Sequence, residues 1–219
     1  MNYYRITKPS YSSDYEDVIT NGFAYSNESS GYYDLIKKGY PRPLDPRTIL
    51  AELYSINVPP ILWSTWTCAF LITDKLLSDF KKIGFSGYEA IPVEIAKVAT
   101  KGKSKGGKKE YAGEPEDLIF NRKNYLKEVK DLPILWGVAI SGEMPLEVKN
   151  GNLQDRVQPF VLASGFSKDL FYPIYKNKRY GRPILCSERF QSLIVENQIG
   201  NIAVNLCSEN WLDTIVIEP

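Results

Sequence analysis

The chain contains no histidine among its 219 residues. This absence removes the commonest general base and the side chain whose ordinary pKa lies nearest to neutral pH. It also excludes Ser-His and Cys-His nucleophile pairs, and every zinc site that needs an imidazole ligand. We therefore expect a protein that is not an enzyme and that has no catalytic, cofactor-binding or metal-ligating residues.

Cysteine is scarce as well, with only Cys68, Cys186 and Cys207. The number is odd, the residues are far apart, and no two of them have the CxxC spacing. A disulfide framework requires an even set in a secreted chain, and this pattern does not supply one. We expect free thiols buried in the core.

Long apolar runs and an excess of one charge are also missing. The most apolar stretch, residues 58–72, contains a double proline and three hydroxyl residues. It is shorter than the about 20 apolar residues that a transmembrane helix needs. Residues 1–9 lack the charged and apolar regions of a signal peptide. A net charge of +1 gives no overall field that would attract nucleic acid or an anionic membrane. We expect a cytoplasmic protein without a membrane partner.

Tyrosine, by contrast, is abundant, with 15 copies. Its ring and hydroxyl suit interfaces as well as cores. Residues 1–45 are polar and rich in tyrosine, serine and asparagine, and we expect them to form an irregular N-terminal segment. Acids beside aromatic rings are typical of surfaces that recognise a basic partner. One such cluster supplies the candidate partner-binding residues, which are Tyr11, Asp14, Tyr15, Glu16 and Asp17.

A strand–helix–strand unit follows in the middle of the chain. Asp45 and Pro46 first predict a short helix that reaches about residue 53. Residues 69–72 then read as a buried strand, and Thr73 as the N-cap of a helix with apolar residues at helical spacing through Ile83. Two glycines end this helix, and residues 89–93 alternate as a second strand.

The C-terminal part repeats this pattern. Residues 184–186 are a short apolar run, and Ser187 stands where Thr73 stood, as an N-cap. Glu188 and Arg189 match the acid and the base of the first helix, and a buried face follows at Phe190, Leu193 and Ile194. Gly200 then precedes a second alternating strand, residues 202–206. We interpret the repeat as two units of common design.

The sequence thus predicts an α+β fold with mixed sheets and two related strand–helix–strand units. Residues 46–219 form the α+β domain, with related halves at 46–100 and 134–219. A Lys/Gly loop at 101–109 and a helix that starts at Pro115 join these halves. Further strands are predicted at 134–140, 157–163, 170–175 and 211–217.

The Lys/Gly loop superficially matches a phosphate-binding loop. Residues 102–108 fit GxxxxGK, but Lys109 follows where Ser or Thr should hold magnesium, and no apolar helix comes next. We therefore predict a solvated loop that binds no nucleotide. Its lysines leave one alternative open, a weak and salt-sensitive contact with nucleic acid through Lys101, Lys103, Lys105, Lys108 and Lys109.

The first repeated unit also resembles a known family. Residues 71–76 read Leu-Ile-Thr-Asp-Lys-Leu, Phe80 follows, and residues 87–93 read Gly-Tyr-Glu-Ala-Ile-Pro-Val. A strand that ends in a hydroxyl and an acid, then a helix, a glycine and a strand of the form G-x-E-x-x-P-V, is similar to a segment of bacterial polymorphic-toxin immunity proteins. The resemblance is clearest over residues 60–100 and weaker over 184–206.

The resemblance implies a cytoplasmic protein that neutralises a cognate protein toxin by tight binding, usually by occluding the toxin's active site. Its motifs are caps, core positions and turns, so it transfers no catalytic residue. One alternative is an enzyme of unknown class that uses carboxylate, Ser or Tyr chemistry, which a pocket with two perturbed carboxylates would favour. The other is the weak nucleic-acid contact of the lysines, and the oligomeric state is left open.

Overall fold

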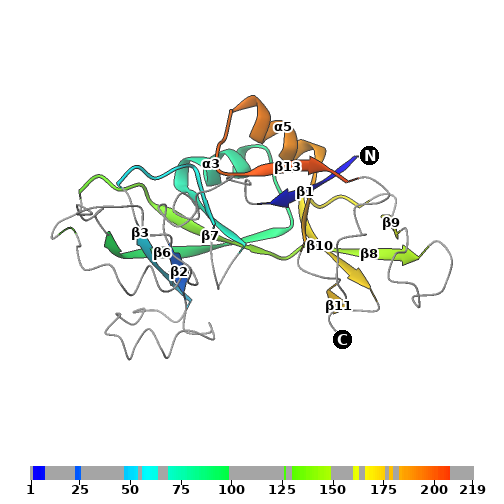
Figure 1. Cartoon of the computed structure of the whole chain (residues 1–219), viewed down its shortest axis with the longest axis horizontal. Helices are drawn as coiled ribbons and strands as arrows, with labels where there is room; N and C mark the ends of the chain where they lie inside the picture. Colours follow the sequence, from blue (N-terminus) through cyan, green and yellow to red (C-terminus); the bar gives the residue numbers. More distant parts are fainter. Residues whose placement is uncertain are drawn as a thin grey trace, which may run out of the picture. The chain divides into compact units, whose positions relative to one another are not determined.

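The computed structural model describes residues 2–7, 23–25, 47–53, 56–63, 69–98, 126, 130–148, 160–162, 166–175, 178–179 and 183–207. These residues form two mixed β-sheets and two helices, which confirms the predicted α+β class (Figure 1). The chain divides into two compact units, each built from separated segments. The first consists of residues 1–9, 78–89 and 139–219, and the second of residues 10–77 and 90–138.

These units do not coincide with the predicted halves, 46–100 and 134–219. The elements α3 (Asp74–Lys82), β6 (Tyr88–Val98) and β7 (Leu135–Ile140) each begin in one unit and end in the other. The strand β1 (Tyr3–Thr7), at the start of the sequence, belongs to the same unit as residues 139–219. Such long-range strand pairing leaves no local mark in the sequence.

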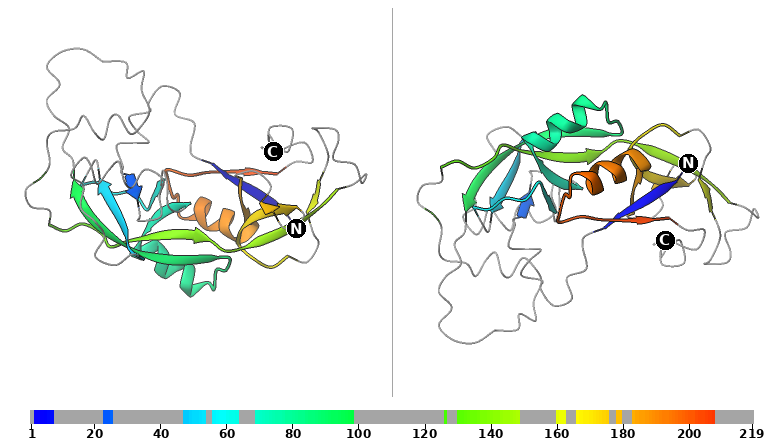
Figure 2. Two further views of the ribbon diagram at one scale, coloured as in Figure 1. Left: turned by 90° about the horizontal axis from the view of Figure 1, so that it is seen from below. Right: turned by 90° about the horizontal axis from the view of Figure 1, so that it is seen from above.

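The first unit contains a seven-stranded sheet with the order β13-β1-β12-β10-β8-β9, and β11 pairs with β10. Strand β1 pairs antiparallel with both β12 and β13. The helix α5 (Glu188–Glu196) packs on β12 and β1 (Figure 2). The other strands are β8 (Glu143–Val148), β9 (Phe160–Leu162), β10 (Leu170–Tyr175), β11 (Lys178–Arg179), β12 (Ile184–Ser187) and β13 (Ala203–Leu206).

The second unit contains most of a six-stranded sheet with the order β2-β3-β6-β7-β5-β4. Its core gathers buried side chains from several of these strands, among them Ala51, Leu62 and Leu71. Besides β6 and β7, the strands are β2 (Phe23–Tyr25), β3 (Ile49–Leu53), β4 (Ile61–Trp63) and β5 (Phe70–Thr73).

Two local predictions are wrong. Residues 1–45 were expected to be irregular, yet β1 and β2 lie within them. The prediction failed because both strands pair with segments that are distant in the sequence. The short helix expected up to residue 53 is instead β3, which is buried along its whole length. Its two edges pair with β2 and β6, and the burial of all five residues shows that both of its faces are covered. A continuous apolar run suits such a strand as well as a helix.

The two strand–helix–strand units are confirmed. The first is β5-α3-β6 and the second is β12-α5-β13, and each contains a helix of nine residues. One strand separates the two strands of each unit, namely β7 between β5 and β6, and β1 between β12 and β13. The Thr73 hydroxyl accepts the N–H of Leu76 at 3.5 Å, and the Ser187 hydroxyl accepts the N–H of Phe190 at 3.4 Å.

The helices also end in the same way. The N–H of Phe85 donates to the carbonyl of Phe80 at 2.9 Å, and the N–H of Ile199 donates to that of Ile194 at 2.9 Å. The preceding residues are Gly84, just after α3, and Gln198, just after α5, with φ angles of +65° and +49°. This left-handed residue and the hydrogen bond across it form a common helix C-terminal motif. The two units therefore match at both ends of their helices.

Removing the two capping hydroxyls should destabilise the protein to different degrees. Replacing Thr73 with alanine removes a capping hydroxyl and should cost about 1 kcal/mol of stability. Replacing Ser187 with alanine should cost more, about 2 kcal/mol, because this hydroxyl also donates to Asp169 at 2.7 Å. Urea unfolding followed by circular dichroism measures both, and equal losses would contradict a second role for Ser187.

Candidate functional site

A turn after α3 is hydrogen-bonded to two other segments of the first compact unit. The carbonyl of Ser86 accepts the N–H groups of Asp169 and Leu170, at 3.2 and 3.1 Å. The carbonyl of Gly87 accepts those of Ser141 and Gly142, at 2.9 and 3.1 Å. The turn is thereby fixed between the β7–β8 connection and the start of β10.

The Asp169 carboxylate lies at this junction and is 2% exposed. Its Oδ1 accepts the Ser187 hydroxyl at 2.7 Å, and its Oδ2 accepts both the N–H and the hydroxyl of Ser86, at 3.0 and 3.3 Å. A guanidinium nitrogen of Arg189 lies 3.7 Å from the same Oδ2. Asp169 thus links the turn at residue 86 to the first turn of α5. Its oxygens are engaged in holding the structure.

Arg189 makes three contacts in the same place. Besides the ion pair with Asp169, it donates to the carbonyl of Ile83, just beyond the end of α3, and its guanidinium lies 5.4 Å from the centre of the Phe85 ring. A cation at a helix C-terminus interacts favourably with the carbonyls exposed there. The Arg189 charge is therefore compensated from three sides.

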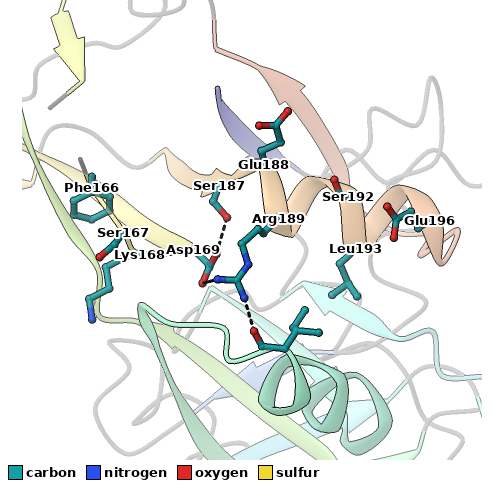
Figure 3. Close-up of a pocket in the computed structure, with 11 residues that line it drawn as sticks. Phe166, Ser167, Lys168, Asp169, Ser187, Glu188, Arg189, Ser192, Leu193 and Glu196 are labelled. Atoms are coloured by element: carbon teal, nitrogen blue, oxygen red, sulfur yellow. Dashed lines mark hydrogen bonds and ion pairs between the residues drawn. The ribbon is translucent and has the colours of Figure 1, made fainter. Parts of the chain in front are cut away.

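These residues border a pocket of about 590 Å³ (Figure 3). Its lining comes from Ile83, from residues 166–169 before β10, and from residues 187–196 along α5. The side chains of Lys168, Glu188 and Glu196 are exposed, and Leu193 supplies apolar surface. Asp169 is the buried carboxylate of this lining, and the other two acids face solvent. A preformed recess with mixed apolar and charged walls is suited to binding.

The two described cysteines are free thiols. Cys186 is buried, as expected, and burial is the main cause that raises its thiol pKa far above the ordinary value. Cys207 is half-buried, and burial raises its pKa to about 11 against the lowering effect of Arg5. Both thiols therefore form the thiolate less readily than an ordinary cysteine does. Cys68 lies outside the described residues.

Within the described ranges, no three Asp, Glu or Cys side chains gather in a way that could hold a metal ion. Neither helix there has the length or the apolar character to cross a bilayer.

Several sequence predictions concern residues that the structure does not describe. These are the candidate partner-binding residues Tyr11, Asp14, Tyr15, Glu16 and Asp17, the Lys/Gly loop 101–109, nearly all of the helix expected after Pro115, and the strand expected at 211–217. The structure therefore does not locate the acidic, tyrosine-bearing cluster relative to the pocket.

The sequence did not predict that these residues form a pocket. Asp169 follows a short polar stretch with no recognisable motif, and only the folded chain brings it to Ser86. Leu193 was assigned to a buried helix face and Ile83 to the helical spacing of the first helix, yet Ile83 is 43% exposed and both line the pocket. The repeat itself held a usable signal, because Leu193 occupies the position that Asp79 holds in α3.

Comparisons of the chain with protein-family models and with curated proteins find no match.

Proposed function

We propose that this chain is an immunity-type protein that neutralises a cognate bacterial toxin by direct binding and steric occlusion of its active site. The resemblance to polymorphic-toxin immunity proteins covers the segments that fold as the two matching units. The polar residues that carry it, such as Thr73 and Asp74, lie at a helix start, where Thr73 caps α3 and Asp74 accepts a hydrogen bond from Trp136 at 2.9 Å. Scaffold roles of this kind are what binding by a preformed surface requires.

One observation carries the proposal. Asp169, the buried carboxylate of the pocket, is hydrogen-bonded to Ser86 and Ser187 and forms an ion pair with Arg189. Such a network fixes the shape of the walls before any partner arrives, and a preorganised surface loses less entropy on association. An inhibitor that blocks a cleft sterically benefits from such rigidity.

The proposal predicts that a large reading frame beside this gene encodes a C-terminal toxin domain, and the test uses that domain. A neighbourhood without such a frame would count against the proposal. Expressed alone, the domain should arrest growth, and co-expression of this chain should restore growth. The purified proteins should form a stable complex with a dissociation constant of about 100 nM or tighter, the range of antibody–antigen complexes with interfaces of standard size. No complex and no protection would refute the proposal.

The stoichiometry of protection distinguishes occlusion from catalysis. A steric inhibitor protects only while it is present in at least equal amount, so titration against the toxin domain should show a break near a 1:1 ratio. Protection at a small fraction of that ratio would indicate turnover, and the enzymatic alternative would then replace occlusion.

A further inference from the structure

The two related helices can be compared position by position, because Thr73 and Ser187 occupy equivalent caps. On the exposed face of α3, Asp79 and Lys82 form an ion pair at 3.3 Å. The equivalent residues of α5 are Leu193 and Glu196. The second helix thus has a half-buried leucine and an exposed acid where the first has a compensated pair.

The charge of Glu196 is also unfavourable for its own helix. The C-terminal end of an α-helix carries a partial negative charge, so cations are favoured there and acids are not. The last turn of α3 follows this rule with Lys81 and Lys82, whereas the last turn of α5 contains no basic residue. Within the described part of the chain, Glu196 forms no ion pair. Residues that break a local rule without local compensation are often functional.

Apolar surface lies beside this acid. Leu193 and the 43% exposed Ile83 both line the pocket, and the small side chain of Ser192 on the same helix as Leu193 lines it as well (Figure 3). Neither positively charged side chain of the pocket forms an ion pair with Glu196. Arg189 is paired with Asp169, and Lys168 lies on the opposite side of the pocket in Figure 3.

We infer that this end of the pocket, formed by Ile83, Ser192, Leu193 and Glu196, binds a basic side chain presented by a partner protein. The apolar stem of an arginine or lysine would lie on Leu193 and Ile83, and its cationic head would meet Glu196 and the negative end of α5. The inference rests on the proposed function, in that the partner is the toxin and the basic side chain belongs to a segment that α5 contacts.

The first experiment does not need the toxin. The full chain, labelled with ¹⁵N, is titrated with n-butylguanidinium chloride, and n-butanol and guanidinium chloride serve as controls that carry only the stem or only the head. Saturable shifts are expected at the amides of Ser192, Leu193 and Glu196, with a dissociation constant on the order of a few millimolar for so small a ligand. Weaker or non-saturating shifts are expected from either control. Absence of saturable shifts at these amides would overturn the inference.

The matched variant is the double substitution Leu193→Asp and Glu196→Lys, which gives α5 the ion pair that α3 already has. It should fold with a thermal midpoint close to that of the native chain, because the cation added to the last turn offsets the loss of the apolar contacts of Leu193. It should nevertheless lose the butylguanidinium response. Val195→Trp, on the same helix at a residue that is 59% exposed and outside the pocket lining, should keep the response. A double variant that still responds like the native chain would refute the site.

The second experiment uses the toxin domain. The double variant should bind it at least tenfold more weakly than the native chain, and Val195→Trp should change the affinity less than threefold. Equal binding of the native chain and the double variant would place the toxin contact elsewhere and refute this inference while the proposed function stands. Butylguanidinium binding without any toxin complex would refute the proposed function while the cation subsite stands.

Discussion

Replacing Asp169 with alanine is expected to lower the free energy of unfolding by about 3–5 kcal/mol, because three hydrogen-bond donors lose their shared acceptor. The side chain is 2% exposed and accepts three hydrogen bonds, one from Ser187 and two from Ser86. Its removal leaves these donors without their acceptor in a partly buried place, and each such loss costs about 1–3 kcal/mol. The measurement is urea unfolding followed by circular dichroism.

Two matched variants separate this network from an ordinary surface charge. Asp79→Ala removes an exposed ion pair with Lys82 and should cost no more than about 1 kcal/mol. Asp169→Asn keeps the side-chain volume and one acceptor oxygen. Its loss of unfolding free energy should therefore lie between those of Asp169→Ala and Asp79→Ala. If Asp169→Ala costs no more than Asp79→Ala, the carboxylate does not hold the turn at Ser86 to α5.

The contrast between Asp169 and Ser187 shows how far the sequence could predict this site. Ser187 was predicted as an N-cap because a cap depends on neighbours three residues away. Asp169 meets Ser86, a separation of 83 residues, and no local rule connects two such positions. The strand–helix–strand units were likewise predictable because their caps, apolar spacing and glycines are local signals.

The failed predictions have the same origin. The residues of β3 look like the apolar face of a short helix, and only pairing with β2 and β6 makes them a buried strand. Strand β1 completes a sheet with β12 and β13, whose residues lie about 180 and more positions later in the sequence. Ile83 and Leu193 have the spacing of core residues, but only the three-dimensional packing reveals that the pocket leaves them accessible. Periodicity predicts the elements, and it does not predict which of their apolar residues are covered.

Replacing Gly87 with alanine is the second substitution with a large expected effect, about 3–5 kcal/mol. Its φ of +88° is in the left-handed region, which costs a side-chain-bearing residue about 1–2 kcal/mol. A Cβ at this position would lie 2.0 Å from the carbonyl oxygen of Leu170, so the turn or β10 must move, and forced overpacking typically costs about 1–3 kcal/mol. The affected carbonyl of Gly87 also accepts the N–H groups of Ser141 and Gly142.

Two other glycines separate these contributions. Gly84 has a φ of +65° and nothing within 4 Å of its Cβ position, so alanine there carries the conformational cost alone and should lose about 1 kcal/mol. At Gly142 the Cβ would lie 2.1 Å from the same Leu170 oxygen without a positive φ, so alanine there carries the steric cost alone, about 1–3 kcal/mol. Urea unfolding of the three variants should therefore place Gly87→Ala as the most destabilised.

If Gly87→Ala were no more destabilising than Gly84→Ala, the backbone at β10 would be free to move away from the added Cβ. The pocket wall that Asp169 anchors would then be adaptable instead of preformed, which would remove the main support for binding by a rigid surface.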